Sequence, residues 1–100
     1  MRAPPLGALT FTADVTHGIG LVKTTRYFEE QVLRKRRYLR REWCERALRE
    51  AVERRVQPDG RVRYWVFIPE LGRYLRVVTL ADGETVHNAF PDRRYQEPEP

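Results

Sequence analysis

Alternating apolar and polar residues dominate the carboxy-terminal half of the chain. Three such runs, at about residues 61–68, 73–80 and 84–90, have the two-residue period of half-buried antiparallel strands. A stretch containing Pro and Gly fills the first turn. Asp82-Gly83 fills the second, as a two-residue hairpin loop prefers. The predicted core face of this sheet collects Val62, Tyr64, Val66, Leu75, Val77, Val86 and Phe90.

Apolar residues three and four positions apart predict two helices before the strands. Thr24 or Thr25 can cap the first helix, which we expect to run to about Arg36. The apolar stripe changes phase near residues 37–39, so a break is expected there. The second helix is expected over about residues 40–55, where acid-first Glu–Arg pairs lie four residues apart. Its inner face would carry Leu39, Trp43, Ala47, Leu48, Ala51 and Val52, and that of the first helix Phe28, Val32 and Leu33.

These elements predict an α+β fold in which two helices pack on one face of a three- to four-stranded antiparallel sheet. Either Ile19–Lys23 or Leu9–Ala13 would supply the extra strand. A chain of 100 residues with 41% hydrophobic content suits a single core.

The expected domain covers residues 22–95. Residues 1–21 contain few charges and read as an amino-terminal extension, and residues 96–100 as a flexible tail. Because the character of the chain changes abruptly at Leu21, translation that starts at Val22 is one hypothesis for the extension.

The other face of the predicted sheet, here the outer face, mixes arginines with aromatic rings where small polar residues are usual. Such a surface predicts binding more clearly than it predicts a reaction. Its residues are Arg61, Arg63, Trp65, Phe67, Tyr74, Arg76 and His87.

The two turns also predict a register. Arg63 and His87 would lie in one cross-strand row, and Trp65 would face Arg76 in the next. Arg63, Arg76 and His87 would then surround one small anionic group. A one-residue slip would reverse the faces, and Asn88 lies on the core side in this register.

The formal net charge of +5 is unevenly distributed. Residues 22–56 hold twelve basic and six acidic side chains, which is compatible with a nucleic-acid partner or with a solvated helical surface. The basic run Arg34-Lys35-Arg36-Arg37, continued by Arg40 and Arg41, brackets the expected helix break and is a candidate phosphate-binding site.

Composition limits the kinds of site and the cellular location that we expect for the protein. Cys44 is the only cysteine, so no internal disulfide is expected, and its place on the inner side of a helix predicts an inert thiol. The chain lacks a phosphate-binding loop, a Ser nucleophile and paired carboxylates, so classical hydrolase, kinase and metalloenzyme functions are not expected, and neither is a metal or another cofactor. No run is long enough to span a membrane, and a cytoplasmic location is expected. Abundant charge with few thermolabile residues is typical of thermophile proteins.

Three functions compete for the outer face. The rings could stack on RNA bases while arginines hold phosphates, and His87 would add metal-independent endoribonuclease chemistry as an acid or base. Alternatively, the same residue types suit a non-catalytic protein interface or a homodimer. Rings and arginines that merely cover the sheet are the third possibility.

From about Lys23 to Tyr95, the order of elements resembles the small bacterial BrnT-type proteins of the RelE/ParE-like toxin superfamily. The resemblance lies in the charged helical pair 27–55, the segment Tyr74–Val78 and the last strand Glu84–Phe90. It implies a toxin–antitoxin pair, with RNA or an antitoxin-like protein as the partner. Arg63, Arg76 and His87 are the catalytic candidates, although the superfamily has no universal catalytic motif to transfer.

Overall fold

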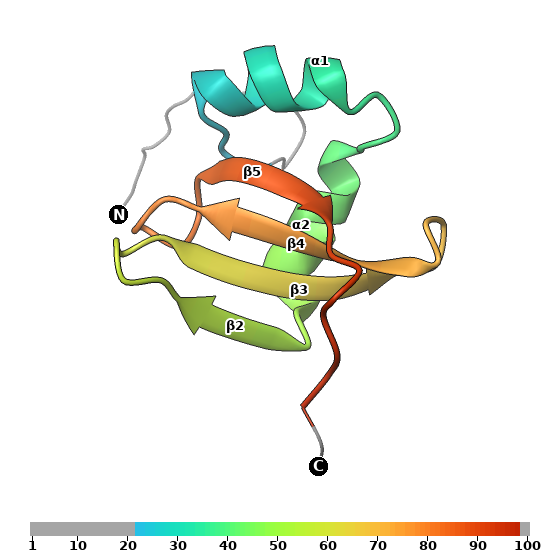
Figure 1. Ribbon diagram of the computed structural model, residues 1–100. Helices are drawn as coiled ribbons and strands as arrows, with labels where there is room; N and C mark the ends of the chain where they lie inside the picture. Colours follow the sequence, from blue (N-terminus) through green and yellow to red (C-terminus); the bar gives the residue numbers. More distant parts are fainter. Residues whose placement is uncertain (1–21, 99–100) are drawn as a thin grey trace, which may run out of the picture.

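The computed structural model describes residues 22–98, in which two helical segments precede a four-stranded antiparallel sheet (Figure 1). The first segment, residues 26–35, contains the π-helix η2 (Phe28–Val32) and α1 (Leu33–Lys35). The second segment is α2 (Arg41–Glu50). The strands lie in chain order as β2 (Glu53–Val56), β3 (Val62–Ile68), β4 (Arg73–Thr79) and β5 (Val86–Pro91). The predicted α+β class is confirmed.

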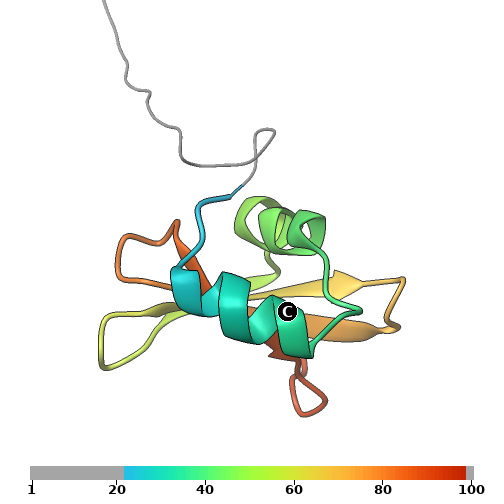
Figure 2. The same ribbon diagram turned by 90° about the horizontal axis from the view of Figure 1, so that it is seen from above.

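The first helical segment begins as its sequence predicts. The Phe28 N–H donates a hydrogen bond of 3.0 Å to Thr25 Oγ1, so Thr25 caps the segment. Residues 36–40 form the expected break before α2. Figure 2, seen from above, shows the first segment beside the edge of the sheet and α2 on the side of the sheet that faces away from the viewer in Figure 1. η2 contacts β5, while α2 contacts β3 and β4.

One hydrophobic core contains residues of both helical segments and of the sheet. Its helical members include the predicted residues Phe28, Val32 and Trp43, and buried Cys44 lies among them. The sheet contributes Val62, Tyr64, Val66, Ile68, Leu75, Val77, Val86 and Ala89. Phe90, predicted for the core face of the sheet, is not in the core.

The second helix is shorter than the sequence predicted. It ends at Glu50, Ala51 has extended backbone (φ −56°, ψ 139°), and residues 53–56 form β2. β2 pairs antiparallel with β3 through the turn at residues 57–61, and Val56 faces Val62. Glu–Arg pairs four apart contribute only about 0.2–0.5 kcal/mol each, too little to outweigh the strand pairing. Val52, predicted to be buried, is 42% exposed.

Within the described residues β2 is therefore the fourth strand of the sheet, a strand that the sequence assigned to Ile19–Lys23 or Leu9–Ala13. Leu9–Ala13 and residues 19–21 lie outside the described residues. Beyond them, Thr24 forms a single parallel bridge with Val86, whose N–H donates to the Lys23 carbonyl at 2.8 Å.

The predicted register holds between β3 and β4 and fails between β4 and β5. Trp65 faces Arg76 as expected. However, Val78 pairs with Asn88 and Thr79 with Val86, so His87 is the extra residue of a β-bulge. The bulge moves Asn88 out of the core. It also brings Phe90 to the outer face opposite Arg76, and Ala89 into the core.

Candidate nucleic-acid interface

Guanidinium groups and aromatic rings alternate across all four strands of the outer face. The Arg55 Cζ lies 5.2 Å from the centroid of a Trp65 ring. The Arg76 Cζ lies 5.5 Å from the centroid of a Trp65 ring and 5.0 Å from that of the Phe90 ring. The Arg36 Cζ lies 5.9 Å from the Phe90 centroid. These distances are within the range of cation–π attraction. We call this set the cation–π ladder.

Asp92, the first residue after β5, binds two members of the ladder. Its Oδ2 accepts hydrogen bonds from Trp65 Nε1 (3.0 Å) and from Arg76 Nε (3.1 Å) and Nη2 (2.8 Å). Burial acts to raise the pKa of the Asp92 carboxyl, but the bonds from Trp65 and Arg76 outweigh it and leave the pKa below its ordinary value. Asp92 is therefore ionised at neutral pH and offsets the charge of Arg76.

After β5 the chain turns back and crosses the outer face toward β2 (Figure 1); residues 92–97 are here called the strap. The Tyr95 ring stacks on Trp65, with centroids 4.8 Å apart and an interplanar angle of 12°. Its hydroxyl donates to Glu53 Oε1 at 2.8 Å, and the Tyr74 hydroxyl donates to Glu97. Trp65 is only 2% exposed beneath these contacts, which leaves its ring little room to stack on a base.

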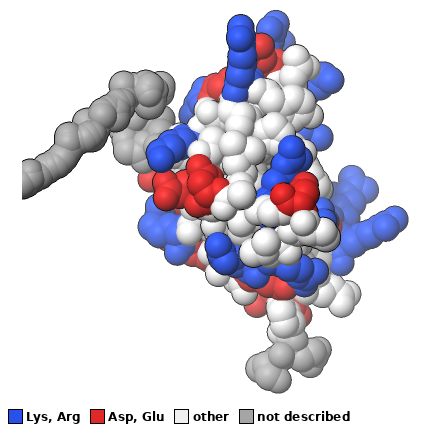
Figure 3. Space-filling model, turned by 90° about the vertical axis from the view of Figure 1, so that its left-hand side faces the viewer, with Lys and Arg blue, Asp and Glu red and all other residues white. Residues whose placement is uncertain are grey.

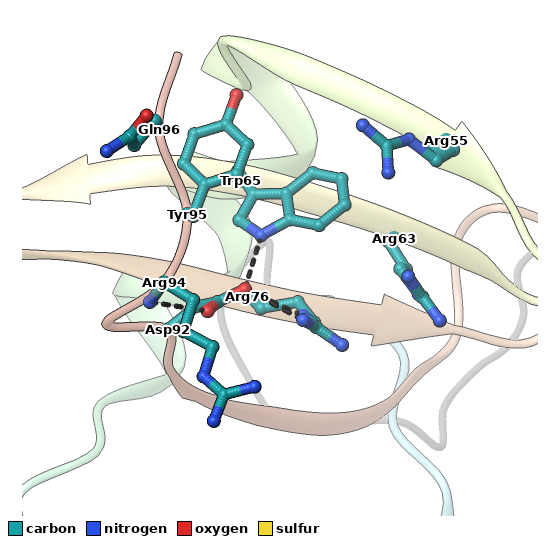
Figure 4. Close-up of a pocket in the computed structure, with 8 residues that line it drawn as sticks. All are labelled: Arg55, Arg63, Trp65, Arg76, Asp92, Arg94, Tyr95 and Gln96. Atoms are coloured by element: carbon teal, nitrogen blue, oxygen red, sulfur yellow. Dashed lines mark hydrogen bonds and ion pairs between the residues drawn. The ribbon is translucent and has the colours of Figure 1, made fainter.

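Beside the strap, the outer face is hollowed into a pocket of about 240 Å³ (Figure 4). Arg55 and Arg63, which face each other across β2 and β3, lie on one side of it, and the strap lies on the other. The lining consists of Arg55, Arg63, Trp65, Arg76, Asp92, Arg94, Tyr95 and Gln96. Four arginines thus line the pocket, and its lining supplies one carboxylate.

Two of the four arginines lack an acidic partner. Arg63 donates from Nε to the Gln57 side-chain oxygen at 2.7 Å, and within residues 22–98 no carboxylate pairs with Arg63 or with the Arg94 guanidinium. The other two pair with Glu53 and Asp92. An anion that enters the pocket therefore meets positive charge that the described residues do not neutralise.

His87 lies apart from this pocket and is not among its lining residues. Its Nδ1 is 3.0 Å from Thr25 Oγ1, and its ring stacks on Tyr27 with centroids 4.8 Å apart. Burial lowers the pKa of the imidazole below its ordinary value, and the charge of Arg61 lowers it further. A neutral imidazole held by the first helical segment is the result.

The remaining outer-face candidates differ in access. Phe67 is 43% exposed and meets the edge of Tyr74, with ring centroids 5.3 Å apart. Arg61 is exposed and lies 3.8 Å from the Asp59 carboxylate. In Figure 3, Lys and Arg side chains project along the right-hand side of the molecule, where the outer face is seen in profile.

The basic run divides into three groups. Arg36 reaches the outer face, where its Nη1 donates to Asn88 Oδ1 at 3.5 Å. Arg41 is held by Glu29 through two hydrogen bonds, one of them 2.6 Å from Nη2 to Oε1. The other members are exposed and form no ion pair with any residue in the described range; they are Arg34, Lys35, Arg37 and Arg40.

Sequence reasoning missed five residues of the pocket, namely Arg55, Asp92, Arg94, Tyr95 and Gln96. One signal was present, because an indole N–H beside a guanidinium needs an acceptor, and Asp92 is the first acid after the last strand. Arg55 was concealed because it was assigned to the helix. Nothing in the local sequence indicates that Tyr95 returns over Trp65.

Within residues 22–98 no cluster of three metal-binding side chains occurs, and none of the helices seen there is both long and apolar enough to cross a membrane. No family model matches the chain, and no curated protein and no solved structure matches it either. The resemblance to the RelE/ParE-like toxin superfamily therefore stays a prediction from the order of elements.

Proposed function

We propose that the protein binds single-stranded RNA through the outer face, with phosphate groups at the arginine pocket. The observation that carries this proposal is a pocket whose lining holds four arginines and one carboxylate. Guanidinium groups bind phosphate oxygens through paired, charge-assisted hydrogen bonds. Of these arginines, Arg63 and Arg94 are the freest to do so, because no described acid pairs with them.

A chain of phosphates fits this face better than one isolated anion. The cation–π ladder leads from the pocket across β4 and β5 to Arg36. Arg36 belongs to the basic run, whose other members include four exposed cations without described acidic partners. Positive charge therefore continues beyond the pocket, and a flexible polyanion can follow it.

RNA bases have one open ring within this surface. Phe67 is 43% exposed, whereas Trp65 is covered by Tyr95. We therefore assign phosphate contact to the arginines of the pocket. Phe67 lies on the other side of the Tyr95–Trp65 stack, so it can stack only on a base of a strand that passes over the strap. A cytoplasmic location, where RNA is available, is part of this proposal.

Binding without cleavage is the form of the proposal that the geometry supports. Endoribonuclease chemistry at Arg63, Arg76 and His87 requires an imidazole close to the phosphate. His87 instead contacts Thr25 and Tyr27 and does not line the pocket. Asp92 also offsets Arg76, which weakens its ability to stabilise a developing negative charge.

Fluorescence anisotropy with a labelled single-stranded RNA tests the proposal. Affinity should fall steeply with salt, since each neutralised phosphate releases counterions. Arg63→Gln and Arg94→Gln should each weaken binding by about tenfold and lower the salt slope by about one. Arg49→Gln is the matched control, because it removes the same charge from α2 behind the sheet, and it should change affinity by less than about twofold.

Equal effects of all three substitutions would contradict the proposal, as would an affinity that salt does not change. RNA cleavage that His87→Ala abolishes would restore the endoribonuclease prediction. Self-association by light scattering, with no RNA binding, would favour the homodimer or an antitoxin-like partner on the same face.

A further inference from the structure

We infer that the arginine pocket recognises a terminal phosphate monoester of an RNA strand, rather than a phosphodiester within it. This inference rests on the proposed function and names the chemical group that the pocket takes. It follows from the charge of the pocket, from the wall that the strap forms, and from the donors that remain free.

The first argument is charge. A phosphodiester carries one negative charge, whereas a phosphate monoester carries about −1.5 to −2 at neutral pH. The pocket lining holds four arginines against Asp92 alone, and Glu53 pairs with Arg55 at its rim. An excess of two to three positive charges around one small space is matched better by the monoester.

The second argument is the shape of the pocket. Asp92, Tyr95 and Gln96 of the strap line one side of it, opposite Arg55 and Arg63 (Figure 4). The strap is anchored where Tyr95 stacks on Trp65 and where its hydroxyl donates to Glu53. A strand that lay in the pocket could leave on the arginine side, but the strap blocks the opposite side. A strand end fits between these two sides without having to cross the strap.

The third argument is the set of available donors. Arg63 uses Nε to donate to Gln57, which orients the guanidinium, while its Nη groups donate to no residue in the described range. Arg94 likewise has no side-chain partner there, although its backbone N–H is bound to Asp92. Each of these guanidinium groups offers a fork of N–H donors, which suits the terminal oxygens of a phosphate monoester.

The test is competition among unlabelled RNA oligomers of one sequence against an internally labelled RNA. The competitors carry a 5′-phosphate, a 3′-phosphate or hydroxyls at both ends. One of the two phosphorylated oligomers should compete about tenfold better than the hydroxyl form. Arg63→Gln and Arg94→Gln should reduce this preference to about twofold or less, and Arg49→Gln should leave it unchanged.

The outcomes separate this inference from the proposed function. Equal competition by all three oligomers would overturn the terminal-phosphate inference and leave RNA binding intact. Failure of every oligomer to bind would overturn both. A phosphoserine peptide that competed as well as the phosphorylated RNA would assign the pocket to a phosphoprotein. A nucleoside 5′-monophosphate that bound as tightly as the RNA would remove the requirement for a strand.

Discussion

The carboxylate of Asp92 and the guanidinium of Arg76 form an ion pair, with 2.8 Å between Oδ2 and Nη2. Their side chains are 10% and 25% exposed, so solvent screens this pair less than it screens the other ion pairs of the surface. The pair attaches the strap to β4, and it also places a negative charge inside a pocket that we propose binds phosphate. Stability and anion binding therefore make opposite demands on Asp92.

Asp92→Asn should separate these two effects. Unfolding free energy should fall by about 1–3 kcal/mol, because the charge-assisted bonds from Trp65 and Arg76 are weakened. RNA affinity should rise at the same time, because the charge of Arg76 is no longer offset. Urea unfolding and fluorescence anisotropy give the two readouts.

Glu84→Gln is the control for Asp92→Asn, since Glu84 is an exposed acid that pairs with Lys23 at 3.2 Å. It should change stability by less than about 0.5 kcal/mol. Weaker RNA binding by Asp92→Asn would show that the carboxylate does not oppose the ligand.

Stability should fall in acid partly because Asp92 takes up a proton. Its pKa in the folded protein lies below the unfolded value of about 3.9. The folded state therefore binds this proton less readily than the unfolded state. The stabilisation is complete above the unfolded pKa and is lost as the pH falls through the folded pKa.

Unfolding free energies of the wild type and Asp92→Asn, measured between about pH 6 and pH 2, test this dependence. The difference between the two proteins should shrink as the pH falls. A difference of constant size would assign the acid sensitivity to other groups, such as Glu53, whose pKa is also lowered, first by its bond from Arg55.

Tyr95→Ala should uncover Trp65, because the Tyr95 ring stacks on the indole. Iodide should then quench tryptophan fluorescence more strongly, while Trp43 stays protected in the core. The loss of the stack should cost about 1–2 kcal/mol. Tyr95→Phe keeps the ring, loses the bond to Glu53, and should leave quenching at the wild-type level. Similar quenching of the wild type and Tyr95→Ala would contradict the stacked strap.

Gly83 and Gly72 form a matched pair for testing the hairpin turns. Both have positive φ, +72° and +65°, so an Ala at either position should cost about 1–2 kcal/mol. At Gly83 the added Cβ would also lie 3.3 Å from the Tyr64 hydroxyl, which donates to the Gly83 carbonyl. Thermal unfolding should therefore show a larger loss for Gly83→Ala than for Gly72→Ala. The reverse order would contradict this turn geometry.

Cys44 should be unreactive in the native protein. Burial raises the pKa of its thiol to about 12, although the charge of Arg41 lowers it slightly. At pH 8 a disulfide reagent such as DTNB should modify Cys44 only at the rate at which the protein opens. Addition of urea should make the reaction fast. Fast modification without denaturant would show that the α2 side of the core is open.

Strand pairing shows where prediction from sequence reaches its limit. The β3–β4 register followed from the turn and from alternation, and Trp65 faces Arg76 as expected. The β4–β5 register failed at His87, because a bulge adds one residue without leaving a turn signal. The predicted register therefore placed Phe90 on the core face and His87 beside an anion site. In the structure Phe90 lies on the outer face, and His87 does not line the pocket.

The end of α2 failed for a different reason. Glu50 and Arg54 have the spacing of a helical pair, but residues 53–56 instead form a strand that pairs with β3. The sequence Pro58-Asp59-Gly60 between Val56 and Val62 is itself a hairpin signal. It was interpreted only as the end of a helix, and Arg55 was lost from the candidate site for that reason.

By itself, the sequence determined the α+β class, three of the four described strands, a helical cap at Thr24 or Thr25, and an outer face rich in arginine and aromatic rings. These properties follow from local periodicity and turn chemistry, which act over a few residues. Only the tertiary structure decided that Tyr95 covers Trp65, that Asp92 offsets Arg76, and that His87 lies apart. Those relations join residues 16 to 62 positions apart, at distances set by the whole sheet, and no local pattern encodes them.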